Sequence, residues 1–177
     1  MTYLSQPNYN SDQALGYTHP KFAQQFFTGS VMIGENTSNP HFYVKKATGT
    51  PSGNITFRCW DSSGNVLHTY GTYDSTQLTS AYQLITPDSD TAYTTPLANG
   101  DMIGCEFTGS SSLYYHVAFD TANQIDNATY QDYRSSSSSW VNQSPADLGF
   151  KINYGASPPP ETTSTRLPPP PIVLGGY

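Results

Sequence analysis

Apolar and polar residues alternate along short stretches of this chain, and that alternation predicts β-strands joined by polar turns. The clearest stretch is 54–60, where Ile55, Phe57 and Cys59 share one face of a strand. The turn sequence DSSGN follows it, and glycine there suits a positive φ. Residues 66–70 then return as the second strand of a hairpin.

The same alternation predicts further strands along most of the chain. We expect them at about 22–28, 41–46, 80–86, 102–108, 113–119, 128–134, 140–141 and 148–154. About ten short strands at intervals of about ten residues are typical of an all-β, antiparallel β-sandwich or jelly roll. We therefore predict one sandwich domain over 21–155, preceded by an extended N-terminal arm over 1–20.

Residues 156–177 differ in composition from the rest of the chain. Two proline runs there predict stiff polyproline II segments, because proline donates no backbone hydrogen bond and fits poorly inside a sheet. A short apolar tail follows the second run. We expect this C-terminal arm to leave the sandwich and hold a neighbouring copy. The residues of this assembly segment are Pro168, Pro169, Pro170, Pro171, Ile172, Val173 and Leu174.

Composition narrows the classes of partner. Only 11% of residues are charged, the formal net charge is −6, and the seven basic residues form no stripe, so we expect no nucleic-acid partner. No apolar run approaches the roughly 18 residues that a membrane helix needs, and we expect no membrane insertion. The N-terminal sequence lacks an apolar signal core, so we expect a mature exported form or a protein released by another route.

The two cysteines, Cys59 and Cys105, belong to no CxxC pair, so zinc-binding spacing is absent. Each shares a strand face with large apolar residues, which predicts that both side chains point into the core. A disulfide between them and a pair of buried thiols both fit this pattern.

No catalytic signature is present, and we expect neither enzymatic activity nor a cofactor. A glycosidase needs two carboxylates across a cleft; Asp101 and Glu106 are the only pair worth weighing, and Asp101 reads as a turn residue. A structural calcium site is the weak candidate, with Asp120 and Asp126 as oxygen ligands in one loop. The alternative is that these residues bond their own backbone.

Aromatic residues make up 14% of the chain, and 14 of them are tyrosine. Exposed rings beside polar side chains are what saccharides bind in sandwich domains, although rings also fill cores and subunit contacts. The candidate glycan-binding residues are Trp60, Tyr114, Tyr130, Tyr133 and Trp140. Four sequons mark candidate N-glycosylation sites, at Asn36, Asn54, Asn127 and Asn142.

Several stretches carry a family resemblance. They are FAQQFFTG, FYVKKATGTPSGNITFRCWDSSGNVLHTYGTYDSTQLT, LANGDMIGCEFTGSSSLYYHVAF and SWVNQSPADLGFKINY. In order and spacing they resemble β-sandwich modules of archaeal, especially thaumarchaeal, surface proteins, which look like carbohydrate-binding or lectin-type jelly rolls. The chain departs from such modules in its two cysteines and in standing as a single module. The resemblance implies exposure outside the cell.

Two functions follow as expectations. The first is a structural subunit of an extracellular filament, sheath or virion surface, with copies of itself as partners. The alternative is a lectin-like protein that binds cell-surface glycans. The C-terminal segment favours the first, and the aromatic residues favour the second.

Overall fold

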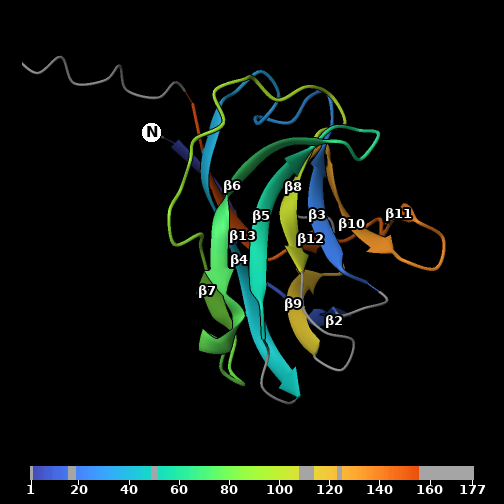
Figure 1. The fold of residues 1–177 in the computed structure, drawn as a ribbon. Helices are drawn as coiled ribbons and strands as arrows, with labels where there is room; N and C mark the ends of the chain where they lie inside the picture. Colours follow the sequence, from blue (N-terminus) through green and yellow to red (C-terminus); the bar gives the residue numbers. More distant parts are fainter. Residues whose placement is uncertain (1, 16–18, 49–51, 108–113, 123–124, 156–177) are drawn as a thin grey trace, which may run out of the picture.

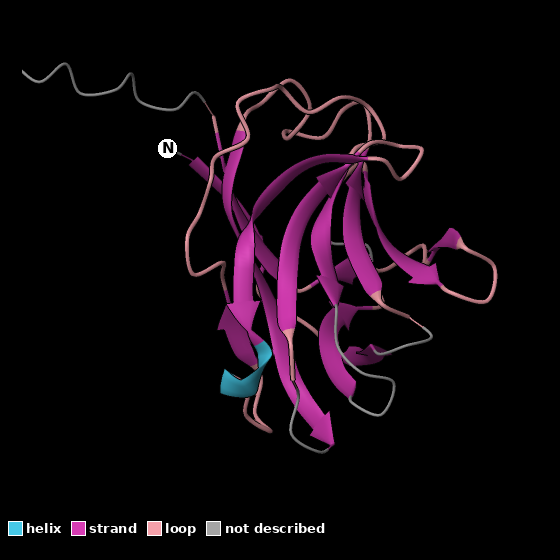
Figure 2. Ribbon diagram, viewed as in Figure 1, coloured by secondary structure: helices cyan, strands magenta, loops and turns pink. Residues whose placement is uncertain are grey.

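The computed structural model describes residues 2–15, 19–48, 52–107, 114–122 and 125–155. These residues form two antiparallel β-sheets packed face to face, which confirms the predicted all-β sandwich (Figures 1 and 2). The helical content of the described residues is a single 3-10 turn, Ser75–Gln77. None of the helical structure described is long and apolar enough to cross a membrane.

The first sheet has seven strands. Their bounds are β1 Thr2–Gln6, β2 Ser11–Leu15, β4 Thr37–Thr48, β7 Gln83–Ile85, β9 Tyr114–Asp120, β12 Asp147–Leu148 and β13 Phe150–Tyr154. The order is β1-β13-β4-β9-β12, with β2 paired to β9 and β7 paired to β4.

The second sheet has six strands. Their bounds are β3 Lys21–Phe26, β5 Asn54–Trp60, β6 Val66–Asp74, β8 Met102–Phe107, β10 Ala128–Arg134 and β11 Ser139–Asn142. The order is β11-β10-β3-β8-β5-β6. Each of these strands was predicted from alternation, and β5 and β10 have the predicted bounds.

The N-terminal segment corrects one prediction. Residues 1–20 were expected to form an arm outside the sandwich, yet β1 pairs with β13 and β2 pairs with β9 within the seven-stranded sheet. Leu4 packs against the core from β1, which ties this segment to the domain. The predicted C-terminal arm, residues 156–177, lies outside the described residues.

Strand β4 is longer than predicted because a bulge lets it continue past a proline. His41 pairs with Lys151 and Ser38 pairs with Asn153, so two residues, Asn39 and Pro40, stand opposite one residue of β13. Asn39 adopts a φ of 48°, which asparagine tolerates better than most residues. The bulge accommodates the missing N–H of the proline within the sheet.

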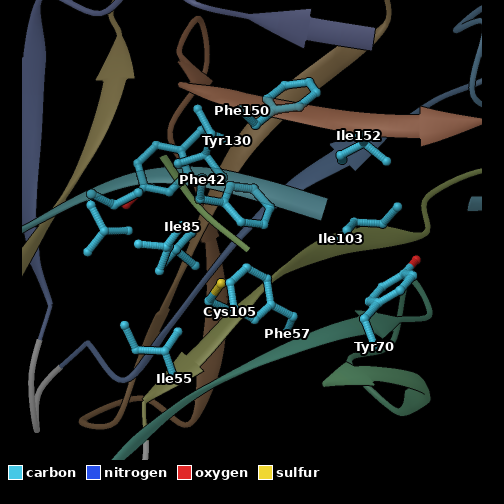
Figure 3. Packing of buried hydrophobic residues seen from close by; sticks show 14 of the residues in the cluster. Phe42, Ile55, Phe57, Tyr70, Ile85, Ile103, Cys105, Tyr130, Phe150 and Ile152 are labelled. Atoms are coloured by element: carbon cyan, nitrogen blue, oxygen red, sulfur yellow. The ribbon is translucent and has the colours of Figure 1, made fainter. Parts of the chain in front are cut away.

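Alternate side chains of both sheets meet in one core. Figure 3 shows Phe42, Phe150 and Ile152 of the seven-stranded sheet facing Ile55 and Phe57 of the six-stranded sheet. All five are buried. Each such side chain contributes about 1.5–3 kcal/mol on leaving water, so the core holds the two sheets together and fixes which side chains face outward.

Both cysteines point into this core, as predicted, and both are free thiols. The strand register explains why the candidate disulfide is not formed. Cys105 stands opposite Phe57, and Cys59 stands opposite Ile103, so the cysteines are diagonal neighbours. Diagonal pairs lie about 7–8 Å apart, whereas a disulfide needs Cβ atoms about 3.5–4.5 Å apart.

Candidate functional site

The outer face of the six-stranded sheet carries a shallow hollow near one edge. On β3 and β10, Phe22 and Asp132 are buried, so their strand neighbours Lys21 and Tyr133 face outward. Trp140 of β11 stands opposite Tyr133. The hollow has a volume of about 440 Å³, within the range of about 300–1,000 Å³ for ligand pockets. Its lining residues are Lys21, Ser62, Ser63, Gly64, Tyr133, Ser138, Ser139 and Trp140.

Trp140 is the aromatic centre of this Trp140 hollow. Its ring packs edge-on against Trp60, with centroids 5.2 Å apart, and against Tyr133 at 5.6 Å. A Cβ at Gly64 would lie 2.9 Å from the indole nitrogen of Trp140, and Gly64 has a φ of +86°. The absence of a side chain at Gly64, in the β5–β6 turn, leaves room for the indole ring of Trp140. The buried Trp60 ring packs against the same indole.

Lys21, which lines the hollow, belongs to an ion-paired group of three charged side chains. Glu106 contacts Lys21 Nζ at 3.2 Å and Arg58 Nε at 2.9 Å. The Lys21 ammonium also lies 4.8 Å from the centre of the Tyr133 ring, a cation–π distance. Lys21 has three N–H donors, and the ion pair with Glu106 uses one of them, so the ammonium can still donate to a ligand beside the ring.

A second hollow lies on the outer face of the seven-stranded sheet. Its volume is about 260 Å³, and its lining residues are Tyr9, Asn10, Ser11, Asp12 and Tyr82. The ring of Tyr9 packs against Tyr82 at 4.9 Å and against Tyr43 at 5.4 Å. We call this site the Tyr9 hollow.

Asp12 organises the polar side of the Tyr9 hollow. Its Oδ2 accepts hydrogen bonds from Lys45 Nζ at 2.9 Å and from the Tyr82 hydroxyl at 2.8 Å, and its Oδ1 lies 2.6 Å from His116 Nδ1. The Lys45 hydrogen bond is the main reason that the pKa of Asp12 is about 2, below its ordinary 3.8. Burial raises the pKa of Tyr82, and the Asp12 carboxylate raises it further. Asp12 is therefore ionised and Tyr82 neutral at physiological pH.

The five predicted glycan-binding residues have different locations. Tyr133 and Trp140 lie together in the Trp140 hollow. Trp60 is on the predicted outer face but is fully buried beneath Trp140, and Tyr130 is a core residue with 1% exposure, so neither can contact a ligand directly. Tyr114 belongs to β9, and its side chain lies outside what the structure describes.

Sequence reasoning missed most of the polar lining. Lys21 follows from the inward position of Phe22, because neighbours on a strand face opposite sides. Ser62, Ser63 and Gly64 belong to the DSSGN segment, whose sequence indicates a turn and no binding role. Tyr9 was missed because its segment was assigned to an arm, and no alternation marks it as part of the sheet.

The candidate calcium ligands serve other contacts. Asp120 Oδ1 accepts hydrogen bonds from Asn10 Nδ2 at 2.9 Å and from the backbone N–H of Ala122 at 3.0 Å, the turn-forming alternative. Asp126 instead lines a small hollow with Leu4 and Val31. Within the described ranges, no three His, Cys, Asp or Glu side chains gather where they could hold a metal ion.

Asp101 and Glu106, the two carboxylates considered for hydrolysis, make different contacts. Asp101 is buried and accepts the backbone N–H of Ala98 at 2.8 Å, and burial raises its pKa. Glu106 faces outward and is ion-paired with two cations. The Trp140 hollow offers ring surfaces, an ammonium and hydroxyl groups.

The sequons differ in exposure. Asn54, Asn127 and Asn142 are exposed, and Asn36 is half-buried. Asn142 Oδ1 accepts hydrogen bonds from the Ser144 backbone N–H at 2.6 Å and from the Thr129 hydroxyl at 3.1 Å. Asn54, at the start of β5, thus presents an accessible sequon, while modification itself stays a prediction.

Comparison of the chain with protein-family models, with curated proteins and with solved structures finds no match. The resemblance to archaeal surface modules therefore stays a prediction.

Proposed function

We propose that this chain is a non-enzymatic saccharide-recognition module that acts outside the cell or on a virion surface. The single observation that carries the proposal is the Trp140 hollow, where two aromatic rings, an ammonium and serine hydroxyls converge on one shallow space. The lectin-like jelly-roll character implied by the sequence resemblance agrees with this use.

The chemistry of the hollow suits a sugar ring. The C–H face of a sugar is apolar and packs on aromatic rings such as Trp140 and Tyr133, while its hydroxyls accept from an ammonium and exchange hydrogen bonds with hydroxyl groups. Lys21, Ser62 and Ser139 supply such groups around the rings. The hollow is shallow and its lining is mostly polar, as expected of a site that binds part of a longer chain.

Tryptophan fluorescence can report binding at the Trp140 hollow, because the two tryptophans of the chain are Trp60 and Trp140. We expect a bound oligosaccharide to change tryptophan emission, and a panel of cellohexaose, mannohexaose and chitohexaose to contain at least one ligand. Trp140→Ala removes the reporter and is therefore titrated calorimetrically; it should weaken binding at the Trp140 hollow at least about tenfold, equivalent to about 1.4 kcal/mol. Tyr3→Ala is the matched control, since Tyr3 is an exposed tyrosine that lines neither hollow.

If no saccharide binds, or if Trp140→Ala binds as well as the original chain, the Trp140 hollow is not a recognition site. Isothermal titration calorimetry on the same panel covers ligands that leave the emission unchanged.

A second candidate function is the structural subunit of an extracellular filament, sheath or virion surface. The observation that favours it is β6, the last strand of the six-stranded sheet, on which Val66 and Leu67 are 47% and 40% exposed. A strand at a sheet edge can pair with a segment of another chain. The apolar residues 172–174 of a neighbouring copy are the segment that we propose pairs there.

The added strand would lie beside residues 66–69, because the carbonyls of Tyr70 and Thr72 already accept hydrogen bonds from Thr91 and Asp88. Deleting 156–177 should leave thermal unfolding unchanged but abolish ordered assembly in electron micrographs, and Leu67→Lys should do the same. Val31→Lys, at an exposed apolar residue outside β6, is the control. Unchanged assembly in the deletion variant would remove this candidate.

A further inference from the structure

We propose that the Tyr9 hollow is a second saccharide-binding site, which makes this single domain bivalent. The inference rests on the proposed function for its ligand class, but it concerns different residues on the opposite sheet. The partner is a glycan with repeated sugar units, one chain at each face of the sandwich.

The placement of the two hollows follows from strand parity. Phe42 and Val44 of β4 are buried in the core, so Tyr43 and Lys45 face outward from the seven-stranded sheet. His116 faces the same way, because its neighbours Tyr115 and Val117 are buried. Lys21 and Tyr133 face outward from the six-stranded sheet. The two hollows therefore open on opposite faces, and one ligand ring cannot occupy both.

The Tyr9 hollow shares with the Trp140 hollow a pair of aromatic rings beside polar side chains. Tyr9 is 38% exposed and presents its ring beside Tyr82, at a centroid distance of 4.9 Å. The volume of about 260 Å³ is slightly below the range of about 300–1,000 Å³ typical of pockets for drug-sized ligands. Such a space suits one sugar ring.

Asp12 supplies a fixed acceptor for a sugar hydroxyl. A carboxylate has about four acceptor positions, and the contacts with Lys45, Tyr82 and His116 occupy three of them. These contacts hold the carboxylate in one orientation, and Oδ1 keeps an acceptor position. Because Asp12, Tyr9 and Tyr82 line the same hollow, a sugar that donates a hydroxyl to Asp12 there can also pack its ring on the tyrosines.

A cationic ligand fits this site less well than a neutral sugar does. Tyrosine clusters also bind quaternary ammonium groups. Here the Lys45 ammonium already lies 4.5 Å from the centre of the Tyr82 ring, and it would repel a second cation. The arrangement therefore favours a neutral, hydroxyl-rich ligand.

Bivalency has a consequence for avidity. When one domain binds two units of the same polymer or surface, the second binding event takes place at a high effective concentration. A protein with one site binds a polysaccharide without linking its chains, whereas a protein with two opposed sites cross-links them. Cross-linking therefore distinguishes the two arrangements.

The test uses the full chain, its Tyr9→Ala and Trp140→Ala variants and the double variant. Each is titrated calorimetrically with the oligosaccharide panel named above and mixed with the corresponding polysaccharide in a turbidity assay. We expect two sites per chain in the original protein, one in each single variant and none in the double variant. Tryptophan emission should respond in Tyr9→Ala but not report the remaining site in Trp140→Ala. Cross-linking should disappear in both single variants, and Tyr9→Phe, which keeps the ring, should restore it.

The possible failures are separable. One site per chain, lost in Trp140→Ala and unaffected in Tyr9→Ala, overturns the bivalent inference and leaves the proposed function standing. One site lost only in Tyr9→Ala supports the Tyr9 hollow, overturns bivalency and removes the Trp140 hollow as the recognition site. Binding of phosphocholine without any saccharide, or no binding at all, overturns the inference and the proposed function together. Unchanged thermal unfolding of Tyr9→Ala excludes a loss of fold as the cause.

Discussion

Trp140 packs edge-on against Trp60 at a centroid distance of 5.2 Å, although the two residues lie 80 positions apart in the chain and only Trp60 is fully buried. Trp60 shares a small second cluster with Ala23 and Met102 on the outer side of the six-stranded sheet. One tryptophan thus supports the sheet, and the other lies over it and lines the hollow.

We expect truncation of the two tryptophans to lower the free energy of unfolding by different amounts. Trp60→Ala should lower the free energy of unfolding by about 3–5 kcal/mol, as expected for removing a buried aromatic ring. Trp140→Ala should cost about 1–2 kcal/mol, because its ring is partly exposed. Denaturant unfolding followed by far-ultraviolet circular dichroism measures both. Equal losses in the two variants would contradict the division of roles.

Alternation along the chain predicted the central strands β3, β5 and β8 well because each carries large apolar residues on its inner face, among them Phe22, Phe57 and Ile103. It could not predict that Trp60 is covered, since Trp140 reaches it only in the folded sheet. Tyr130 and Tyr133 show a different limit. They lie three positions apart on one strand and therefore face opposite sides, so the strand pattern itself should have separated them.

The sequence pattern does not predict β1 and β2, and the reason is physical. β1 and β2 read TYLSQ and SDQAL, and neither has the run of alternating large apolar residues that marks a strand. They are held by backbone pairing to β13 and β9, which sequence pattern does not reveal. The sequence pattern does not predict the Tyr9 hollow either, because Tyr9 lies between these two strands.

We expect the addition of a Cβ atom at Gly104 to destabilise the fold severely. A Cβ there would lie 1.9 Å from the carbonyl oxygen of Phe22 and 2.5 Å from the Cα of Ala23, on a neighbouring strand of the six-stranded sheet. Gly104→Ala should therefore cost at least about 3 kcal/mol or prevent folding. Yield of soluble protein and denaturant unfolding measure the effect.

Gly149→Ala is the control for this variant, because its Cβ would lie no closer than 3.2 Å to a side-chain atom of Tyr43. It should cost less than about 1 kcal/mol. A Gly104→Ala protein as stable as this control would show that strands β3 and β8 can separate without loss.

Asp12 predicts a defined pH dependence. Its folded pKa of about 2 lies below its ordinary value of 3.8, so its contribution to stability is complete above about pH 4 and is lost as the pH falls toward 2. Asp12→Asn should reduce stability near pH 6 by no more than about 1 kcal/mol, because solvent screens a partly exposed ion pair. The difference between the two proteins should shrink between pH 4 and pH 2 in urea unfolding. A constant difference across that range would be inconsistent with this ion pairing.

We expect the thiols of Cys59 and Cys105 to be free but unreactive in the folded protein. Burial raises the pKa of both thiols, and the reactive species is the thiolate. Folded protein should not react with an aromatic disulfide reagent, whereas protein in concentrated guanidinium should show both thiols without added reductant. Absence of free thiol after denaturation would mean that the two cysteines are bonded after all.

The pairing of β1 with β13 has a mechanical consequence. Thr2 lies opposite Tyr154, and Gln6 lies opposite Phe150, so the N-terminal end of β1 and the C-terminal end of β13 meet at the same end of the ladder. A force that pulls these two ends apart would open the hydrogen bonds one after another, as in peeling, instead of loading all of them together in shear. The β1–β13 ladder would therefore yield readily to tension applied at Thr2 and Tyr154.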